Sequence, residues 1–170
     1  LFVINQRSGR KKTDYETIIK RYSSENGLNS SYIVIPKKKP GQELEKQVRK
    51  TTPQIVVAVG GDGTVSLVAH AVMGKNIKMA IIPAGSANGM ARELEIPADP
   101  LAALDLIREG KTAVCDLVQV NNEQLCMHLS DLGLNARLVK YFQEGRFRGF
   151  LGYTFALLKA LRRRNRFYTH

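Results

Sequence analysis

The stretch Gly60-Gly61-Asp62-Gly63-Thr64 is the part of this sequence best suited to chemistry. It follows the apolar run 55–59 and precedes apolar residues at helical spacing, at positions 65, 68, 69 and 72. Glycines between a strand and a helix let the chain turn sharply and let a ligand approach backbone N–H groups. The N terminus of the following helix also attracts an anion. Taken alone, the pattern fits a phosphate-binding loop and a plain tight turn equally well.

A second loop, Pro83-Ala84-Gly85-Ser86-Ala87-Asn88-Gly89, follows the apolar run 79–82. Strand and helix signals alternate on both sides of the two loops. Strands are expected at 1–4, 32–35, 55–59 and 78–83. Helices are expected from a capping box at Thr13 to about residue 26, after Gly41, over 64–73, from about residue 90, and from Asp99 to 109. This order predicts a doubly wound, mostly parallel α/β sheet, in which both loops lie at the ligand-binding edge.

The pattern changes after Gly110. Residues 112–120 alternate in polarity, Asn121-Asn122 predicts a turn, and 124–129 predicts a returning strand, so we expect an antiparallel hairpin. Helices are expected over 136–142 and 150–161. We interpret 1–111 as an α/β nucleotide-binding domain and 112–170 as the beginning of a β-rich second domain that is truncated. The start at Leu1 rather than Met also indicates that the native start is absent.

The formal net charge of +11 is the most informative part of the composition. Such a surface attracts nucleotide, nucleic acid or an anionic bilayer. The basic clusters lie at 10–12, at 37–39 and at 162–164 with Arg166. Cys115 and Cys126 show no metal-site spacing, and we expect two buried, reduced thiols in a cytoplasmic protein rather than a disulfide. No signal peptide or membrane span is predicted.

The two glycine-rich loops together resemble a known family. Gly-Gly-Asp-Gly-Thr followed by Pro-x-Gly-Ser-x-Asn-x-x-Ala-Arg is similar to the diacylglycerol kinase catalytic domain, which bacterial lipid kinases share with sphingosine and ceramide kinases. Asn5 with Ser8-Gly9 matches the family's Asn-Pro-x-Ser-Gly, with Gln6 in place of proline. Residues 133–136 resemble a later Gly-Phe-Asp-Ala element, and the helix over 149–164 is also similar.

The resemblance implies ATP-dependent transfer of the γ-phosphoryl group to a lipid hydroxyl at an anionic membrane surface, with Mg²⁺ as cofactor. It implies that Asp62 faces the Mg²⁺–phosphate centre directly or through water, and that Asn135 lies in a region linked to the acceptor. The expected nucleotide-binding residues are Asn5, Gly60, Gly61, Asp62, Gly63, Thr64, Ser86 and Asn88. The basic helix over 149–164 fits peripheral membrane association, and equally fits a helix packed on the absent domain.

Three departures from the family pattern limit these expectations. Gly89 replaces an aspartate that many bacterial diacylglycerol kinases carry, and Asn135 stands where the family often has Asp. The acceptor could therefore be diacylglycerol or a sphingoid lipid. The resemblance also places the catalytic base beyond His170, so we expect no catalytic residue within the chain, weak nucleotide binding and no turnover. Apolar surface left by truncation could favour a homo-oligomer.

Two other functions remain open from the sequence. An NAD kinase-like nucleotide kinase shares a Gly-Gly-Asp-Gly loop, but its second motif normally places Asn ahead of a glycine-rich turn, unlike 83–88. A non-catalytic basic module for membranes or nucleic acid would bind with strong salt dependence, but it leaves both glycine loops unexplained. We therefore expect no specific nucleic-acid partner.

Overall fold

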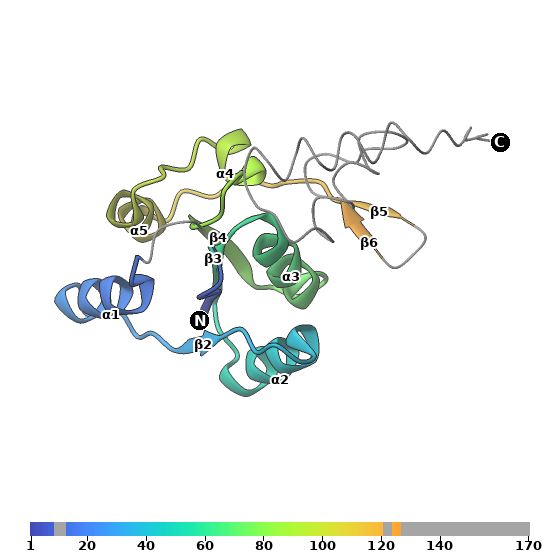
Figure 1. Cartoon of the computed structure of the whole chain (residues 1–170), viewed down its shortest axis with the longest axis horizontal. Helices are drawn as coiled ribbons and strands as arrows, with labels where there is room; N and C mark the ends of the chain where they lie inside the picture. The colour runs from blue at the N-terminus through green and yellow to red at the C-terminus, as the bar shows by residue number, and fades with distance from the viewer. Residues whose placement is uncertain (9–12, 121–123, 127–170) are drawn as a thin grey trace, which may run out of the picture. The chain divides into compact units, whose positions relative to one another are not determined.

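The computed structural model describes residues 1–8, 13–120 and 124–126 (Figure 1). They belong to the unit Leu1–His128, the first of two into which the chain divides. Its centre is a four-stranded parallel sheet in the order β2-β1-β3-β4. The strands are β1 (Phe2–Ile4), β2 (Tyr32–Val34), β3 (Ile55–Gly60) and β4 (Lys78–Pro83).

Helices cover both faces of this sheet. Figure 1 shows α1 (Tyr15–Glu25) and α5 (Pro100–Glu109) on one side, with α2 (Pro40–Thr51) and α3 (Asp62–Val72) on the other. The short α4 (Gly89–Glu93) packs on the α3 side through Met90 and Ala91. In β3, Val56 and Ala58 join the α2/α3 core, whereas Val57 and Val59 join the α1/α5 core. This burial on two faces explains the unbroken apolar run and confirms the predicted doubly wound α/β fold.

Polar caps set the ends of α1 and α5. The expectation that Thr13 caps the first helix was wrong, because the neighbouring Asp14 accepts hydrogen bonds from Thr17 N (3.1 Å) and Thr17 Oγ1 (2.6 Å). Asp99 caps α5 as predicted, accepting from Ala102 N at 2.9 Å. α5 ends at Glu109, and the following Gly110 has a φ of 73° that glycine adopts readily.

The chain beyond Gly110 forms less strand than its alternating pattern predicts. Residues 112–117 have no regular structure, and only β5 (Val118–Val120) and β6 (Gln124–Cys126) pair as antiparallel strands. The exposed Cys115 is a free thiol, so the prediction that it is buried was wrong. The predicted turn at Asn121-Asn122, Asn135, the helices over 136–142 and 150–161 and the cluster at 162–166 lie outside the described residues.

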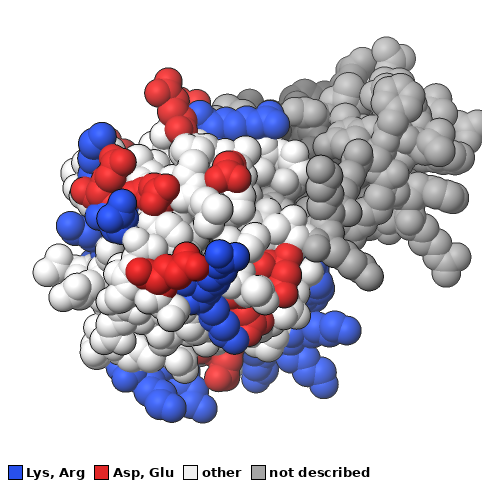
Figure 2. All heavy atoms as spheres, turned by 90° about the vertical axis from the view of Figure 1, so that its left-hand side faces the viewer, with Lys and Arg blue, Asp and Glu red and all other residues white. Residues whose placement is uncertain are grey.

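The described surface carries charges of both signs on the α1/α5 side. Figure 2 shows Lys and Arg side chains there interspersed with Asp and Glu. Ion pairs between positions four apart account for part of this mixture: Lys20 with Glu16 at 2.6 Å and Arg21 with Glu25 at 2.8 Å. Within the described part of the chain, no helix combines the length and apolar character needed to cross a membrane.

Candidate nucleotide-binding site

The candidate site lies where the direction of the sheet's winding reverses. From β1 the chain enters α1 on one face, and from the adjacent β3 it enters α3 on the opposite face. In open α/β sheets, ligands bind in the crevice that such a reversal leaves at the carboxyl ends of the strands. An open hollow of about 260 Å³ occupies this position. Its walls are formed by Asn5, Ser8, Ile35, Pro40, Gly61, Gly63, Thr64 and Leu67.

The end of β1 is joined to the start of α3 by a hydrogen bond between side chains. Asn5 Nδ2 donates to Thr64 Oγ1 at 3.0 Å, and Asn5 Oδ1 accepts from Arg7 N at 3.1 Å. Thr64 is only 3% exposed, and its side chain packs against Gly60. A Cβ on Gly60 would lie 2.5 Å from Thr64 Cβ and closer still to its hydroxyl. Asn5 and Thr64 therefore hold the walls of the hollow together, and Gly60 makes room for that link.

The turn into α3 leaves backbone N–H groups without an acceptor beside the hollow. Gly61 O accepts from Thr64 N at 2.8 Å and from Val65 N at 3.1 Å. Asp62 and Gly63, the first two residues of α3, have no backbone acceptor for their N–H groups among the described residues. A Cβ on Gly63 would meet nothing within 4 Å, so this glycine is not required by packing. Free N–H groups, an open approach and a helix N terminus together suit a phosphate.

The second glycine loop packs directly against the first. A Cβ on Gly85 would lie 2.5 Å from Gly61 Cα and 2.7 Å from Asn88 Oδ1. Asn88 Oδ1 accepts from Gly85 N at 2.8 Å, and Asn88 Nδ2 donates to Gly85 O at 3.0 Å. Asp62 Oδ1 accepts from Met90 N at 3.2 Å, at the start of α4. The two motifs that the sequence places apart thus form one structure.

Asp62 is the candidate metal-binding side chain. It is exposed at the start of α3, and the bond to Met90 N uses only one of its two carboxylate oxygens. Mg²⁺ in phosphate-binding sites is commonly held by one or two carboxylates together with the phosphates themselves. The described residues contain no group of three His, Cys, Asp or Glu side chains placed to hold a metal by themselves. Asp62 therefore fits a Mg²⁺ shared with a bound phosphate.

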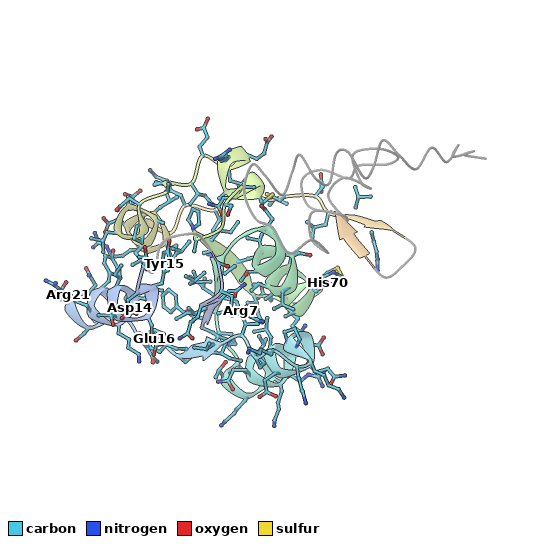
Figure 3. The ribbon with its side chains drawn as sticks, in the orientation of Figure 1. Arg7, Asp14, Tyr15, Glu16, Arg21 and His70 are labelled. Atoms are coloured by element: carbon cyan, nitrogen blue, oxygen red, sulfur yellow. The ribbon has the colours of Figure 1, made fainter. Side chains whose placement is uncertain are left out.

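Three other polar side chains are exposed, and they differ in how close they lie to the start of α3. Ser86 is exposed on the second loop, where its hydroxyl is accessible. Arg7 is an exposed cation in the turn after β1, whereas His70 is exposed in the last turn of α3, away from the start of that helix (Figure 3). The structure thus brings together every expected nucleotide-binding residue. The polar side-chain atoms of Asn5, Thr64 and Asn88, however, bind other parts of the protein.

The sequence reasoning missed the apolar wall of the hollow. Ile35 and Pro40 come from the ends of the segment that joins β2 to α2, and Leu67 lies one turn into α3. A signal was present, because Ile35 ends the strand predicted over 32–35, and the carboxyl end of that strand must reach the same edge of a parallel sheet as Gly60. The exposed Arg7, two residues beyond Asn5, was missed as well.

Comparison with known proteins gives a consistent result. The family model for the diacylglycerol kinase catalytic domain matches residues 1–120. A probable lipid kinase, YegS-like, from Cronobacter sakazakii is 32% identical over 114 residues, covering 65% of this chain and 38% of that protein. A Staphylococcus aureus diacylglycerol kinase is 39% identical over 70 residues, covering 40% of this chain and 22% of that protein.

Solved structures show the same fold. A diacylglycerol kinase from Bacillus anthracis superposes with a TM-score of 0.59 at 21% identity, covering 84% of this chain and 51% of that chain.

Another sequence relative, an uncharacterized protein from Synechocystis, is 32% identical over 138 residues, covering 76% of this chain and 32% of that protein. The chain thus spans roughly a fifth to two fifths of these curated relatives and about half of the solved structure.

Proposed function

This chain belongs to the diacylglycerol kinase catalytic-domain family, and we propose that it provides the nucleotide-binding part of an ATP-dependent lipid kinase. The reaction would transfer the γ-phosphoryl group of ATP to the hydroxyl of a lipid, such as diacylglycerol or a sphingoid lipid, at an anionic membrane surface. One observation carries the proposal: the two glycine loops of the family meet at the carboxyl edge of the sheet, beside its switch point, with Gly61 packed against Gly85.

The backbone of the first loop would bind the phosphates. The N–H groups of Asp62 and Gly63 lie at the N terminus of α3, and the open space at Gly63 lets a phosphate approach them. The hollow beside them would take the rest of the nucleotide, against the apolar wall of Ile35, Pro40 and Leu67. Ser86 would add a hydroxyl from the second loop. Positioning and charge neutralisation, which a backbone-lined site can supply, dominate phosphoryl transfer.

Asp62 would hold Mg²⁺ through its second carboxylate oxygen, directly or through water. When bound, the ion would neutralise charge on the phosphates and draw them toward the start of α3. Asn5 and Thr64 would act by fixing the two walls of the hollow, since their side chains are bonded to each other.

The group that activates the lipid hydroxyl would lie outside the two glycine loops. Asp62 is the only acidic residue or histidine in the two glycine loops, and it is assigned to the metal. A general base must lie within hydrogen-bond reach of the proton that it accepts. As the family resemblance implies, we propose that the 170-residue chain binds nucleotide weakly and does not phosphorylate lipid by itself.

Two measurements test this proposal. Calorimetric titration of Mg-ATP into the chain should give saturable binding, and incubation with labelled ATP and diacylglycerol or sphingosine in anionic vesicles should give no labelled lipid. Absence of any ATP binding would refute the nucleotide-binding function. Labelled lipid formed by this chain would show instead that the activating group lies within it.

A further inference from the structure

We propose that Asn88 is a positioning residue that holds the second glycine loop in its nucleotide-binding geometry by acting through Gly85, and that it is not itself a nucleotide ligand. This inference rests on the proposed function of the site. Its first support is that both polar atoms of the Asn88 carboxamide bind the backbone of Gly85. Oδ1 accepts from Gly85 N at 2.8 Å, and Nδ2 donates to Gly85 O at 3.0 Å.

These two hydrogen bonds pair the backbone of Gly85 just after the last hydrogen bond between β4 and β3. β4 ends at Pro83, and Ala84 N still donates to Gly60 O at 2.9 Å. At Gly85, the N–H and C=O of one residue both pair with the Asn88 carboxamide, which imitates a residue on an adjoining strand. Without Asn88, both backbone groups of Gly85 would have to find water. Asn88 therefore closes the bend over 85–87 by binding the backbone of Gly85 after β4 has ended.

The position of Gly85 matters because it sets the space around the first loop. A Cβ on Gly85 would lie 2.5 Å from Gly61 Cα, so the two backbones are nearly in contact. Gly61 is the N-cap residue of α3, so it directly precedes the free N–H groups at the start of that helix. A shift of Gly85 would therefore remove the backbone contact against which Gly61 packs. Order present before a ligand binds lowers the entropic cost of binding.

Asn88 also has the backbone conformation that such a role requires. Its φ is 52° and its ψ is 48°, a left-handed conformation in which Asn is among the best tolerated residues after Gly. This conformation turns the chain so that the side chain reaches back across three residues to Gly85. The substitution Asn88→Gly therefore keeps the backbone unstrained while it removes both hydrogen bonds.

The chain offers a matched control. Glu95 is also left-handed, with a φ of 53°, and is exposed beyond α4. Glu95→Gly makes the same relief of backbone strain without removing a bond to the loop. Asn88→Asp is a second test variant, because its carboxylate can accept from Gly85 N but cannot donate to Gly85 O.

The experiment uses nuclear magnetic resonance on the full 170-residue chain, with Mg²⁺ and the non-hydrolysable ATP analogue AMP-PNP. In the ligand-free chain, Asn88→Gly should accelerate hydrogen exchange at the Gly85 amide at least about tenfold, because the amide loses its acceptor. The analogue should bind about tenfold more weakly to Asn88→Gly, with Asn88→Asp also weakened and Glu95→Gly unchanged. On saturation of the native chain, the Gly61 and Gly63 amides should shift while the Asn88 side-chain NH₂ resonances stay in place.

Two results would overturn the inference. One is an unchanged Gly85 exchange rate in Asn88→Gly, and the other is a shift of the Asn88 NH₂ resonances on binding that matches those of Gly61 and Gly63. A native chain that does not bind the analogue would refute the proposed function. The Gly85 exchange rate in the ligand-free chain would still decide whether Asn88 holds the loop.

Discussion

Asp62 is assigned two roles, and a pair of substitutions separates them. Its Oδ1 accepts from Met90 N at 3.2 Å and so caps α4, whereas its second oxygen is the proposed Mg²⁺ ligand. Asn at this position retains an oxygen for Met90 N but loses the negative charge, and Ala loses both. Removal of a capping oxygen costs about 1 kcal/mol. We therefore expect Asp62→Ala to unfold about 4 °C earlier, with Asp62→Asn close to the native chain.

In nucleotide binding, Asp62→Asn should behave like Asp62→Ala rather than like the native chain. A carboxylate and a cation in contact near a protein surface interact by about 1 to 4 kcal/mol, so both variants should lose most of a Mg²⁺-dependent gain in ATP affinity of about tenfold or more. Without Mg²⁺, Asp62→Asn should bind ATP at least as tightly as the native chain, because a carboxylate beside a triphosphate repels it. Thermal unfolding followed by circular dichroism and calorimetric titrations with Mg²⁺ or EDTA measure these effects. Persistence of the Mg²⁺ effect in Asp62→Asn would refute the metal assignment, and equal destabilisation by Asn and Ala would refute the capping role.

Other predictions address packing and pH. Gly85→Ala should lower the free energy of unfolding by about 1 to 3 kcal/mol in urea titrations, since its Cβ would lie 2.5 Å from Gly61 Cα; unchanged stability would mean that the two loops are not in contact. Burial, together with its hydrogen bond to Asp105, raises the pKa of Tyr22 above its ordinary value of 10.0. The resulting stabilisation is complete below the unfolded-state pKa and is lost as pH rises through the folded-state pKa. Urea titrations between pH 8 and about 11 should therefore show stability falling more steeply in the native chain than in Tyr22→Phe, and parallel slopes would contradict the shift.

The sequence predicts the fold well because its apolar runs and glycines are unambiguous. The run 55–59 is buried on two faces, as an inner parallel strand requires. The capping residue of α1 was misassigned because Thr13 and Asp14 are adjacent and both are good caps. The strand over 112–120 was overpredicted because alternation shows which residues suit a strand, not whether a partner strand lies beside them. Within the span 112–120, only Val118–Val120 has such a partner.

The sequence predicted where the candidate site lies, but not which of its polar side chains bond to other parts of the protein. Two glycine loops after successive parallel strands must reach the same sheet edge, so their proximity followed from topology. Whether a polar side chain faces the ligand or the protein depends on side-chain contacts between segments far apart in sequence. Asn5 and Thr64, 59 positions apart, illustrate this point, because they bond to each other. The motif alone does not distinguish such a residue from a ligand.

The most direct test of the central claim, phosphate binding by the first glycine loop, is a calorimetric titration of Mg-ATP into the native chain and Gly63→Ala. A Cβ at Gly63 meets nothing within 4 Å, and alanine favours a helix by about 1 kcal/mol over glycine. Gly63→Ala should therefore be as stable as the native chain or more so. Its methyl group would occupy the approach to the N–H groups of α3, so ATP should bind at least about tenfold more weakly. Equal affinity in the two stable chains, or no binding by the native chain, would contradict the claim.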